Sequence, residues 1–301
     1  MAVLLSVNMS EKYSFKKISG MLLMVLATLM MTSMLICIRL VPGNLHPYQL
    51  AFFRNCLGLI LLFTWQSRNG FAFLKTTKLP LHLARGTFNT MAMLAFFPAI
   101  FLTPIATLTA LGFTAQLFAS LLSILILKEQ FRFRRLGVIV FGFIGALIIL
   151  RPGIHPISLG PLLALFAAMM WAVNLFLMKL LSRTDSSVTI AIYMVVCTTP
   201  VTLLASVSVW QWPDLFQWPW LLLIACLGTI AQICLGQSFK LSEASAVMPL
   251  DFLQLIWGAL MGFLVFGEIP DLWIWVGGAI IFSSTTFLIF RESESAEVHV
   301  S

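Results

Sequence analysis

The chain has 301 residues, of which 10% are charged and 60% are apolar, and its mean hydropathy is +1.01. A water-soluble protein of this length would lack the polar side chains to cover its surface, so the composition excludes a soluble fold and predicts residence in a lipid bilayer. The net charge of +7 comes from basic residues in the loops, without a patch of interleaved aromatic residues, so nucleic acid is not expected as a partner.

The first apolar run covers residues 18–38 and follows Lys12, Lys16 and Lys17. It is too long for the hydrophobic region of a signal peptide, and no small-x-small cleavage site accompanies it. We therefore predict a retained first span that follows a cytoplasmic tail at 1–17. Whether translation starts at Met1 or at Met9 is left open.

Windows of about 20 residues, the length that crosses about 30 Å of hydrocarbon, identify ten spans along the chain. They cover residues 18–38, 48–66, 82–102, 105–127, 134–150, 159–180, 188–210, 218–239, 245–266 and 272–290. Pro104 predicts a break between the third and fourth spans, because proline disrupts the preceding helical turn. The predicted fold class is therefore all-α, a polytopic membrane protein with ten transmembrane helices.

Basic residues in the loops predict the orientation of the spans. With the N-terminus inside, the cytoplasmic segments collect nearly all loop lysines and arginines and leave only Arg39 and Arg151 outside. This asymmetry predicts a multi-pass protein of the inner (cytoplasmic) membrane. Both termini, including the tail 291–301, are then cytoplasmic, as an even number of spans requires.

The two halves of the chain align at a shift of about 140 residues, which indicates an internal repeat. The most informative matches place Arg39 opposite Lys179, Glu129 opposite Glu268, Gly137 opposite Gly277 and Arg151 opposite Arg291. The repeats cover 18–151 and 158–290. Because each repeat holds five helices, an odd number, the second must be upside down relative to the first. Inverted repeats are the architecture of secondary transporters, with a substrate site near the midplane of the membrane.

Several short strings of residues carry a resemblance to a known family. They are Leu102 to Thr107 (LTPIAT), Leu127 to Gln130 (LKEQ), Leu150 to Gly153 (LRPG), Met248 to Gln254 (MPLDFLQ) and Phe266 to Asp271 (FGEIPD). In order and spacing the chain resembles the drug/metabolite transporter superfamily, EamA-like family. The last two strings look most like the subgroup of S-adenosylmethionine uptake and riboflavin-type carriers. The resemblance implies a carrier of small metabolites.

Three ionisable side chains lie within the predicted spans, where burial in hydrocarbon costs about 2.5–3.5 kcal/mol on insertion scales. Arg54 lies about six residues into the second span and is a candidate for substrate binding, with a structural ion pair as the alternative. Arg85 lies near the cytoplasmic end of the third span, which favours a structural, interfacial anchor. Asp251 follows Pro249 in a helix break and is a candidate for binding a cationic group or a proton, against a buried partner for Arg54 or Lys240.

Uncharged polar residues complete the predicted substrate site. Asn89, Gln116, Asn174 and Gln254 lie well inside their spans, where such groups otherwise serve as hydrogen-bonding contacts between helices. Trp257 is a candidate for stacking on a flat substrate. Glu129 and Glu268 each precede a helix and are interpreted as structural caps. The histidines and cysteines show no metal-ligand spacing, so no metal or cofactor is expected.

The leading functional hypothesis is a secondary transporter that moves a small polar metabolite by alternating access, with S-adenosylmethionine or an amino-acid-like zwitterion as the substrate class. A riboflavin or drug/metabolite exporter of the same family is the alternative. The chain lacks nucleotide-binding and hydrolase motifs, so a membrane-embedded enzyme or a non-transporting scaffold is the weaker hypothesis and no enzymatic activity is expected. The expected partners are the lipid bilayer and a small molecule, and a homodimer is left open.

Overall fold

The computed structural model describes the backbone of residues 2–67, 76–127, 133–152, 158–181, 184–185, 187–242, 247 and 250–297. Side chains are described for a narrower set, which leaves out positions 2–17, 65–67, 123–127, 133–135, 179, 187–188, 240 and 289–297. Glu129, Pro249 and the side chain of Lys240 therefore lie outside the described residues.

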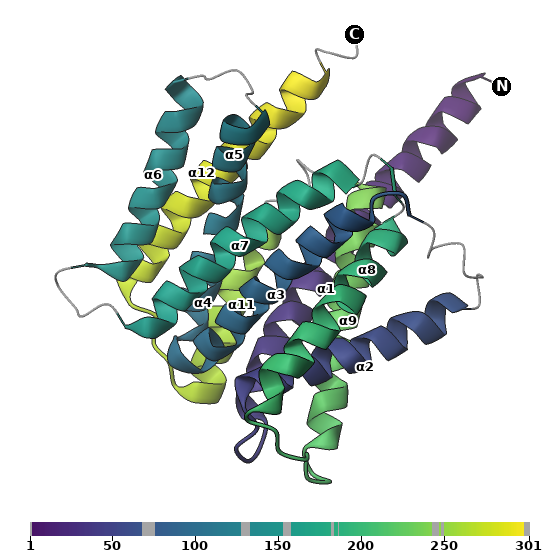
Figure 1. Ribbon diagram of the computed structural model, residues 1–301. Helices are drawn as coiled ribbons and strands as arrows, with labels where there is room; N and C mark the ends of the chain where they lie inside the picture. Colours follow the sequence, from purple (N-terminus) through teal and green to yellow (C-terminus); the bar gives the residue numbers. More distant parts are fainter. Residues whose placement is uncertain are drawn as a thin grey trace.

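The described residues form α-helices and no β-strand (Figure 1). The helices are α1 (Ala2–Leu40), α2 (Pro47–Ser67), α3 (Leu79–Leu102), α4 (Ile105–Gly112), α5 (Thr114–Leu127), α6 (Phe133–Leu150), α7 (Leu159–Leu181), α8 (Ser187–Val207), α9 (Trp218–Leu241), α11 (Leu253–Phe266) and α12 (Leu272–Glu297). Each predicted span has its helix, and the prediction of a polytopic all-α membrane protein is confirmed. The backbone of the predicted tail continues the first helix, since α1 begins at Ala2.

Length and hydropathy identify which described segments are able to cross a bilayer. Five are long and apolar enough, namely Ile18–Leu40, Ile105–Leu122, Leu159–Met178, Thr189–Val207 and Trp218–Phe239, and three shorter apolar segments lie in α6, α11 and α12. Large apolar side chains on the outer faces of these helices are exposed, among them Leu147, Leu204 and Leu264. An exposed apolar surface on so many helices is the surface that lipid covers.

Two spans are interrupted at equivalent places in the two halves. The predicted fourth span is divided at Phe113 into α4 and α5, and a turn at Phe252 precedes α11 in the ninth span. The two phenylalanine rings lie 5.9 Å apart between centroids, so the interruptions meet inside the molecule. The predicted break at Pro104 is also present, because α3 ends at Leu102 and α4 begins at Ile105.

Helix packing follows the two-fold relationship that an inverted repeat requires. In the alignment of the halves, α1, α2, α3 and α6 correspond to α7, α8, α9 and α12. The α1 helix packs on α9, and its counterpart α7 packs on α3, the counterpart of α9. The helices α2 and α8 pack on one another, as do α6 and α12, which run in opposite directions in Figure 1. The five-helix repeats therefore interlock as inverted copies.

Matching glycines in the two halves stand at matching close contacts. A Cβ atom on Gly20 would lie 2.1 Å from Ser242 Oγ at the end of α9, and a Cβ atom on Gly160 would lie 2.2 Å from Thr103 Oγ1 at the end of α3. Glycine therefore lets α1 approach α9, and α7 approach α3, more closely than any larger residue allows. The same local geometry occurs twice, once in each orientation.

Candidate functional site

Arg54 lies in a cavity bounded by three helices. The space between the side chains is about 340 Å³, a figure that includes the open mouth of the cavity. It is lined by Arg54, Asn55, Gly58 and Leu62 from α2, Met194 and Val195 from α8, and Ala225, Gly228, Thr229 and Gln232 from α9. Because α2 belongs to the first repeat and α8 and α9 to the second, the cavity lies between the repeats.

A glycine on α9 makes room for the guanidinium group of Arg54. A Cβ atom on Gly228 would lie 2.8 Å from Met34 Sδ and 3.2 Å from Arg54 Nε, so a larger residue would push against both side chains. Arg54 Nη1 donates a hydrogen bond to Asn55 Oδ1 at 3.0 Å. Among the described residues, no carboxylate lies within ion-pair distance of Arg54. The guanidinium therefore has donors available for an anion that enters the cavity.

Asp251 lies at the helix interruption before α11 and is held by two amide side chains. Gln254 Nε2 donates a hydrogen bond to Asp251 Oδ1, and the side chain of Gln116 at the start of α5 also bonds to this carboxylate. The three residues thus come together where the interrupted spans of the two repeats meet. No described cation forms an ion pair with Asp251, and the Arg54 cavity includes none of these three residues.

Arg85, Asn89 and Asn174 form a separate buried network. Arg85 Nε donates to Asn174 Oδ1 at 2.7 Å, and Arg85 Nη1 donates to the carbonyl oxygen of Ile190 at 2.8 Å. Asn174 Nδ2 donates to Asn89 Oδ1 at 2.7 Å, and Asn89 Nδ2 donates to Thr198 Oγ1 at 3.2 Å. Arg85 is only 5% exposed, so its guanidinium group is held inside the protein. The network joins α3 to α7 and α8.

All of the predicted substrate-site residues except Trp257 therefore fall into three groups instead of lining one cavity. Arg54 lies in the cavity, Asp251 lies with Gln116 and Gln254, and the two asparagines bond to each other. The first and third groups are neighbours, because Met194 lines the Arg54 cavity and its Sδ accepts a hydrogen bond from Arg85 Nη2 at 3.4 Å.

Trp257 and Glu268 occupy contrasting environments. The Nε1 atom of Trp257 on α11 is buried and finds no hydrogen-bond acceptor among the described residues. Such an orphan donor is unusual inside a protein and marks a position where a ligand acceptor would be favourable. Glu268 binds Arg39 at 2.5 Å and accepts the backbone N–H of Ile105 at 2.9 Å. It therefore caps α4 in the other repeat, whereas the sequence predicted a cap for the helix that follows it.

Most of the residues that line the cavity were not among the predicted site residues. Asn55, Gly228 and Thr229 contribute to the cavity because of how α2 meets α9, which the sequence of either helix does not specify. One signal was available for Asn55, since a second polar residue beside an intramembrane arginine favours a hydrogen-bonded pair. No group of His, Cys, Asp and Glu side chains suitable for a metal ion occurs in the described part of the chain.

Comparison with known proteins identifies the family. The model of the EamA-like transporter family matches residues 18–151 and 158–290, one match for each inverted repeat. The chain belongs to the EamA-like transporter family. The resemblance to the drug/metabolite transporter superfamily is thus confirmed, and this member is a multi-pass protein of a transporter family.

Two curated proteins and one solved structure are similar to this EamA-like chain. An S-adenosylmethionine uptake transporter of Rickettsia bellii is 27% identical over 252 residues, which are 84% of this chain and 87% of the relative. A riboflavin transporter of Vibrio cholerae is 37% identical over 189 residues, or 62% and 63% of the two chains. A crystal structure with 17% identity covers 91% of this chain and 98% of its own, with a TM-score of 0.62. That likeness supports the same fold.

Proposed function

We propose that this EamA-like protein is a secondary transporter that binds a small polar metabolite through a carboxylate group at Arg54. The observation that carries the proposal is a guanidinium with no carboxylate partner among the described residues, in a cavity between the two repeats. An intramembrane arginine is costly unless an anion compensates it. Arginine also binds carboxylates with two parallel hydrogen bonds, which supplies both affinity and orientation.

Movement of the substrate is proposed to occur by alternating access. The reciprocal packing of α1 on α9 and of α7 on α3 supports a two-fold relationship between the repeats. In such an arrangement, one set of contacts closes one face while the equivalent set opens the other, and a substrate held between the repeats is exposed to each side in turn. The Arg54 cavity lies between helices of both repeats, where this motion would act.

The Asp251 group is proposed as a second polar site, which takes up a proton or a cationic group. Gln116 and Gln254 both bond to Asp251, and the interrupted helices there leave backbone groups outside the regular helix ladder. A carboxylate without a described cationic partner is a candidate for neutralisation by a proton. We therefore assign the substrate carboxylate to Arg54 and the coupling charge to Asp251. Asn89 and Asn174 are retained as candidate substrate contacts that would be reached if their network with Arg85 opens. Trp257 is retained as a separate candidate contact in α11, because its Nε1 atom has no described acceptor.

The membrane and the orientation are also proposals. The distribution of Lys and Arg among the loops supports an inner-membrane protein with both termini in the cytoplasm. In this orientation the ends of α1, α3 and α6 face away from the cytoplasm.

The experiment that tests the proposal is counterflow in proteoliposomes, with a panel of S-adenosylmethionine, amino acids and riboflavin. S-adenosylmethionine and amino acids carry a carboxylate and riboflavin does not, so the panel separates the two substrate classes of the relatives. We expect exchange of a carboxylate-bearing compound, and we expect Arg54→Gln to abolish it. Arg54→Lys should retain part of it, because a lysine keeps the charge without the bidentate geometry.

The matched control is Arg151→Gln, which removes an arginine whose partner Asp271 lies at the end of the bundle, away from the cavity. We expect this variant to exchange the substrate at the rate of the parent protein. Exchange of riboflavin alone, unchanged in Arg54→Gln, would contradict the carboxylate assignment and leave the transporter family as it stands.

A further inference from the structure

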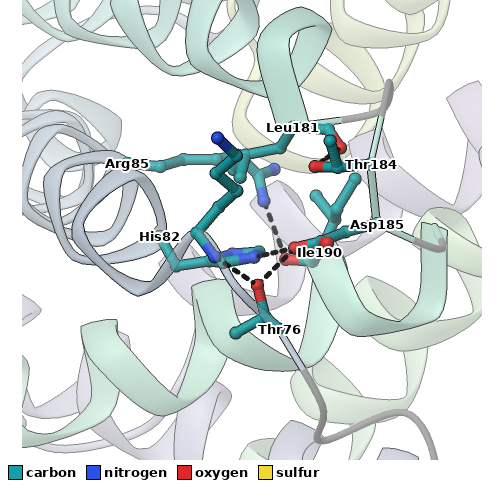
Figure 2. A network of polar contacts seen from close by, with 8 residues as sticks. Thr76, His82, Arg85, Leu181, Thr184, Asp185 and Ile190 are labelled. Carbon is teal, nitrogen blue, oxygen red and sulfur yellow. Dashed lines mark hydrogen bonds and ion pairs between the residues drawn. The ribbon is translucent and has the colours of Figure 1, made fainter.

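A buried histidine and aspartate join the two repeats at the end of the bundle where α3 and α8 begin (Figure 2). His82 Nε2 lies 2.6 Å from Asp185 Oδ2, and the two side chains are 1% and 6% exposed. His82 belongs to α3 in the first repeat, and Asp185 belongs to the connection between α7 and α8 in the second. The contact is therefore one of the points at which the repeats are held together.

Neighbouring groups hold this aspartate in its ionised form. Thr76 Oγ1 donates a hydrogen bond to Asp185 Oδ2 at 2.6 Å, and Figure 2 shows Thr76 and His82 converging on the same carboxylate. The hydrogen bonds from Thr76 and from His82 lower the pKa of Asp185 below its ordinary value. The ring of His82 also stacks on Tyr193 of α8 at 4.6 Å between centroids. Aspartate and imidazole thus form a buried, geometrically defined pair.

The pair begins a polar stripe along one face of α3. His82, Arg85 and Asn89 are spaced three and four residues apart, so they share a helix face. Arg85 and Asn89 continue the contacts into the membrane through the network with α7 and α8. His82 Nδ1 is buried without a described partner, so the ring is held through Nε2 and by stacking.

The inverted copy of this seam has apolar residues in place of His82 and Arg85. With α3 aligned on α9, the positions of His82, Arg85 and Asn89 correspond to Leu221, Ile224 and Gly228. Leu221 and Ile224 are each 1% exposed and pack in the hydrophobic core. At the corner equivalent to the His82 contact, Gln217 Nε2 donates to the carbonyl oxygen of Pro42 at 2.8 Å, which is a neutral contact. The two seams therefore differ in chemistry although the fold makes them equivalent.

The other ion pairs between the repeats that involve described residues lie at the opposite end of the bundle. Arg39 binds Glu268, and Arg151 binds Asp271, each at 2.5 Å. Both join an arginine to a carboxylate that is partly exposed. Only at the end where α3 begins do the described contacts between the repeats include a histidine.

The geometry points to His82 and Asp185 as a positioning pair for the transport step, a clamp that closes this end of the bundle by holding α3 against the connection between α7 and α8. This inference rests on the proposed alternating access. When the clamp is closed, His82 Nε2 and Asp185 are bonded to each other away from water, and when it opens both groups are hydrated at the membrane face. A contact that exchanges between a bonded and a hydrated arrangement is a two-state element that can shift the equilibrium between the closed and open conformations.

The first test measures the reactivity of a cysteine placed in the cavity, so it needs no substrate. Thr229→Cys is labelled with a membrane-impermeant maleimide applied from the side of the His82 contact, and the labelling of the native cysteines is subtracted using the parent chain. Asp185→Asn and His82→Gln should each raise the labelling rate by about tenfold, because each removes a charge-assisted bond that favours the closed state. The matched control is Asp214→Asn, which removes a carboxylate at the opposite end and should leave the rate unchanged.

Thr76→Val is a milder variant for the case that Asp185→Asn or His82→Gln does not fold. It removes one hydrogen bond to Asp185 and keeps the contact between His82 and Asp185. It should raise the labelling rate by a smaller factor than Asp185→Asn does. Unchanged labelling in all three variants, with a single folded species on size-exclusion chromatography, would overturn the clamp.

A second test locks the same contact in a triple variant that combines Thr76→Cys, Asp185→Cys and Thr229→Cys. A short cleavable thiol cross-linker that joins positions 76 and 185 should abolish labelling at position 229, and cleavage should restore it. Each single cysteine at 76 or 185, treated alike, should show no such change. If the locked protein still labels at the parent rate, the contact is a fixed hinge and the inference is wrong. Loss of substrate exchange in Arg54→Gln is measured separately. If the clamp proposal is wrong, the substrate assignment still stands, and if the substrate assignment is wrong, the clamp proposal still stands.

Discussion

Arg39 at the end of α1 lies 2.5 Å from Glu268, and the second oxygen of the same glutamate accepts the backbone N–H of Ile105 at the start of α4. One side chain of the second repeat thus neutralises an arginine of the first and caps one of its helices. The contact shows how the repeats fix each other, since neither partner is supplied by the local sequence.

Replacement of Glu268 by alanine is expected to lower the stability of the folded protein by about 1–2 kcal/mol, because it removes a helix cap and a partly exposed ion pair. Glu268→Gln should cost less, since its amide oxygen still accepts the bond from Ile105. The measurement is the Tm of the detergent-solubilised protein. An unchanged Tm for Glu268→Ala would show that water replaces both contacts at no cost.

Two glycines of α6 form a matched pair for testing the close approach of α6 and α12. A Cβ atom on Gly145 would lie 2.7 Å from the backbone oxygen of Gly277, whereas nothing lies within 4 Å of a Cβ atom on Gly137. Gly145→Ala should destabilise the protein by about 1–3 kcal/mol through overpacking. Gly137→Ala should be neutral or stabilising by up to about 1 kcal/mol, because alanine favours helix. Equal effects of the two variants on Tm would contradict the packing described.

The pKa of Asp185 predicts how the stability of the clamp depends on pH. Its pKa is lowered in the folded protein by the bonds from Thr76 and His82, so this carboxylate stabilises the fold above its unfolded pKa of about 4. That contribution is lost as the pH falls from about 4 through the lower folded value. Below pH 4 the Tm of the parent protein should therefore fall more steeply than the Tm of Asp185→Asn. Parallel curves for the two proteins would show that Asp185 is not stabilised as its contacts indicate.

Substitution of Asp251 is expected to affect proton coupling, whereas substitution of Arg54 is expected to affect substrate exchange. Asp251→Asn keeps a hydrogen-bonding side chain between Gln116 and Gln254 but does not take up a proton. Exchange of substrate across the membrane should continue in this variant, while the stimulation of uptake by an imposed proton gradient should be lost. The readout is uptake with and without the gradient. Full stimulation in Asp251→Asn would remove Asp251 from coupling.

Hydropathy and the positions of prolines predicted most of the fold. The apolar runs define helices because every backbone group in lipid must be bonded within its own segment. Pro104 predicted the break between α3 and α4 for the same reason. The interruption at Phe113 was not predicted, since no proline precedes it, and it becomes evident only because Phe113 meets Phe252 from the other repeat.

The sequence predicted which polar residues are candidates for the site, but it did not predict which of them are in contact in the folded protein. The cost of burying polar groups in a membrane selected Arg54, Arg85 and Asp251 from the sequence, and the structure places all three in polar surroundings. Their partners come from helices far apart in the chain, as Asn89 and Asn174 show with 85 residues between them. The His82 and Asp185 pair escaped prediction because an aspartate in a connection between helices gives no signal of its partner.

The central claim is that Arg54 binds the carboxylate of a transported metabolite, and the most direct measurement is substrate affinity in the purified protein. Isothermal titration with the compound that exchanges in counterflow should give binding that weakens by at least about a hundredfold in Arg54→Gln, as expected when a buried charged partner is lost. Arg151→Gln should bind as the parent protein does. Equal affinity in the parent protein and in Arg54→Gln would contradict the account.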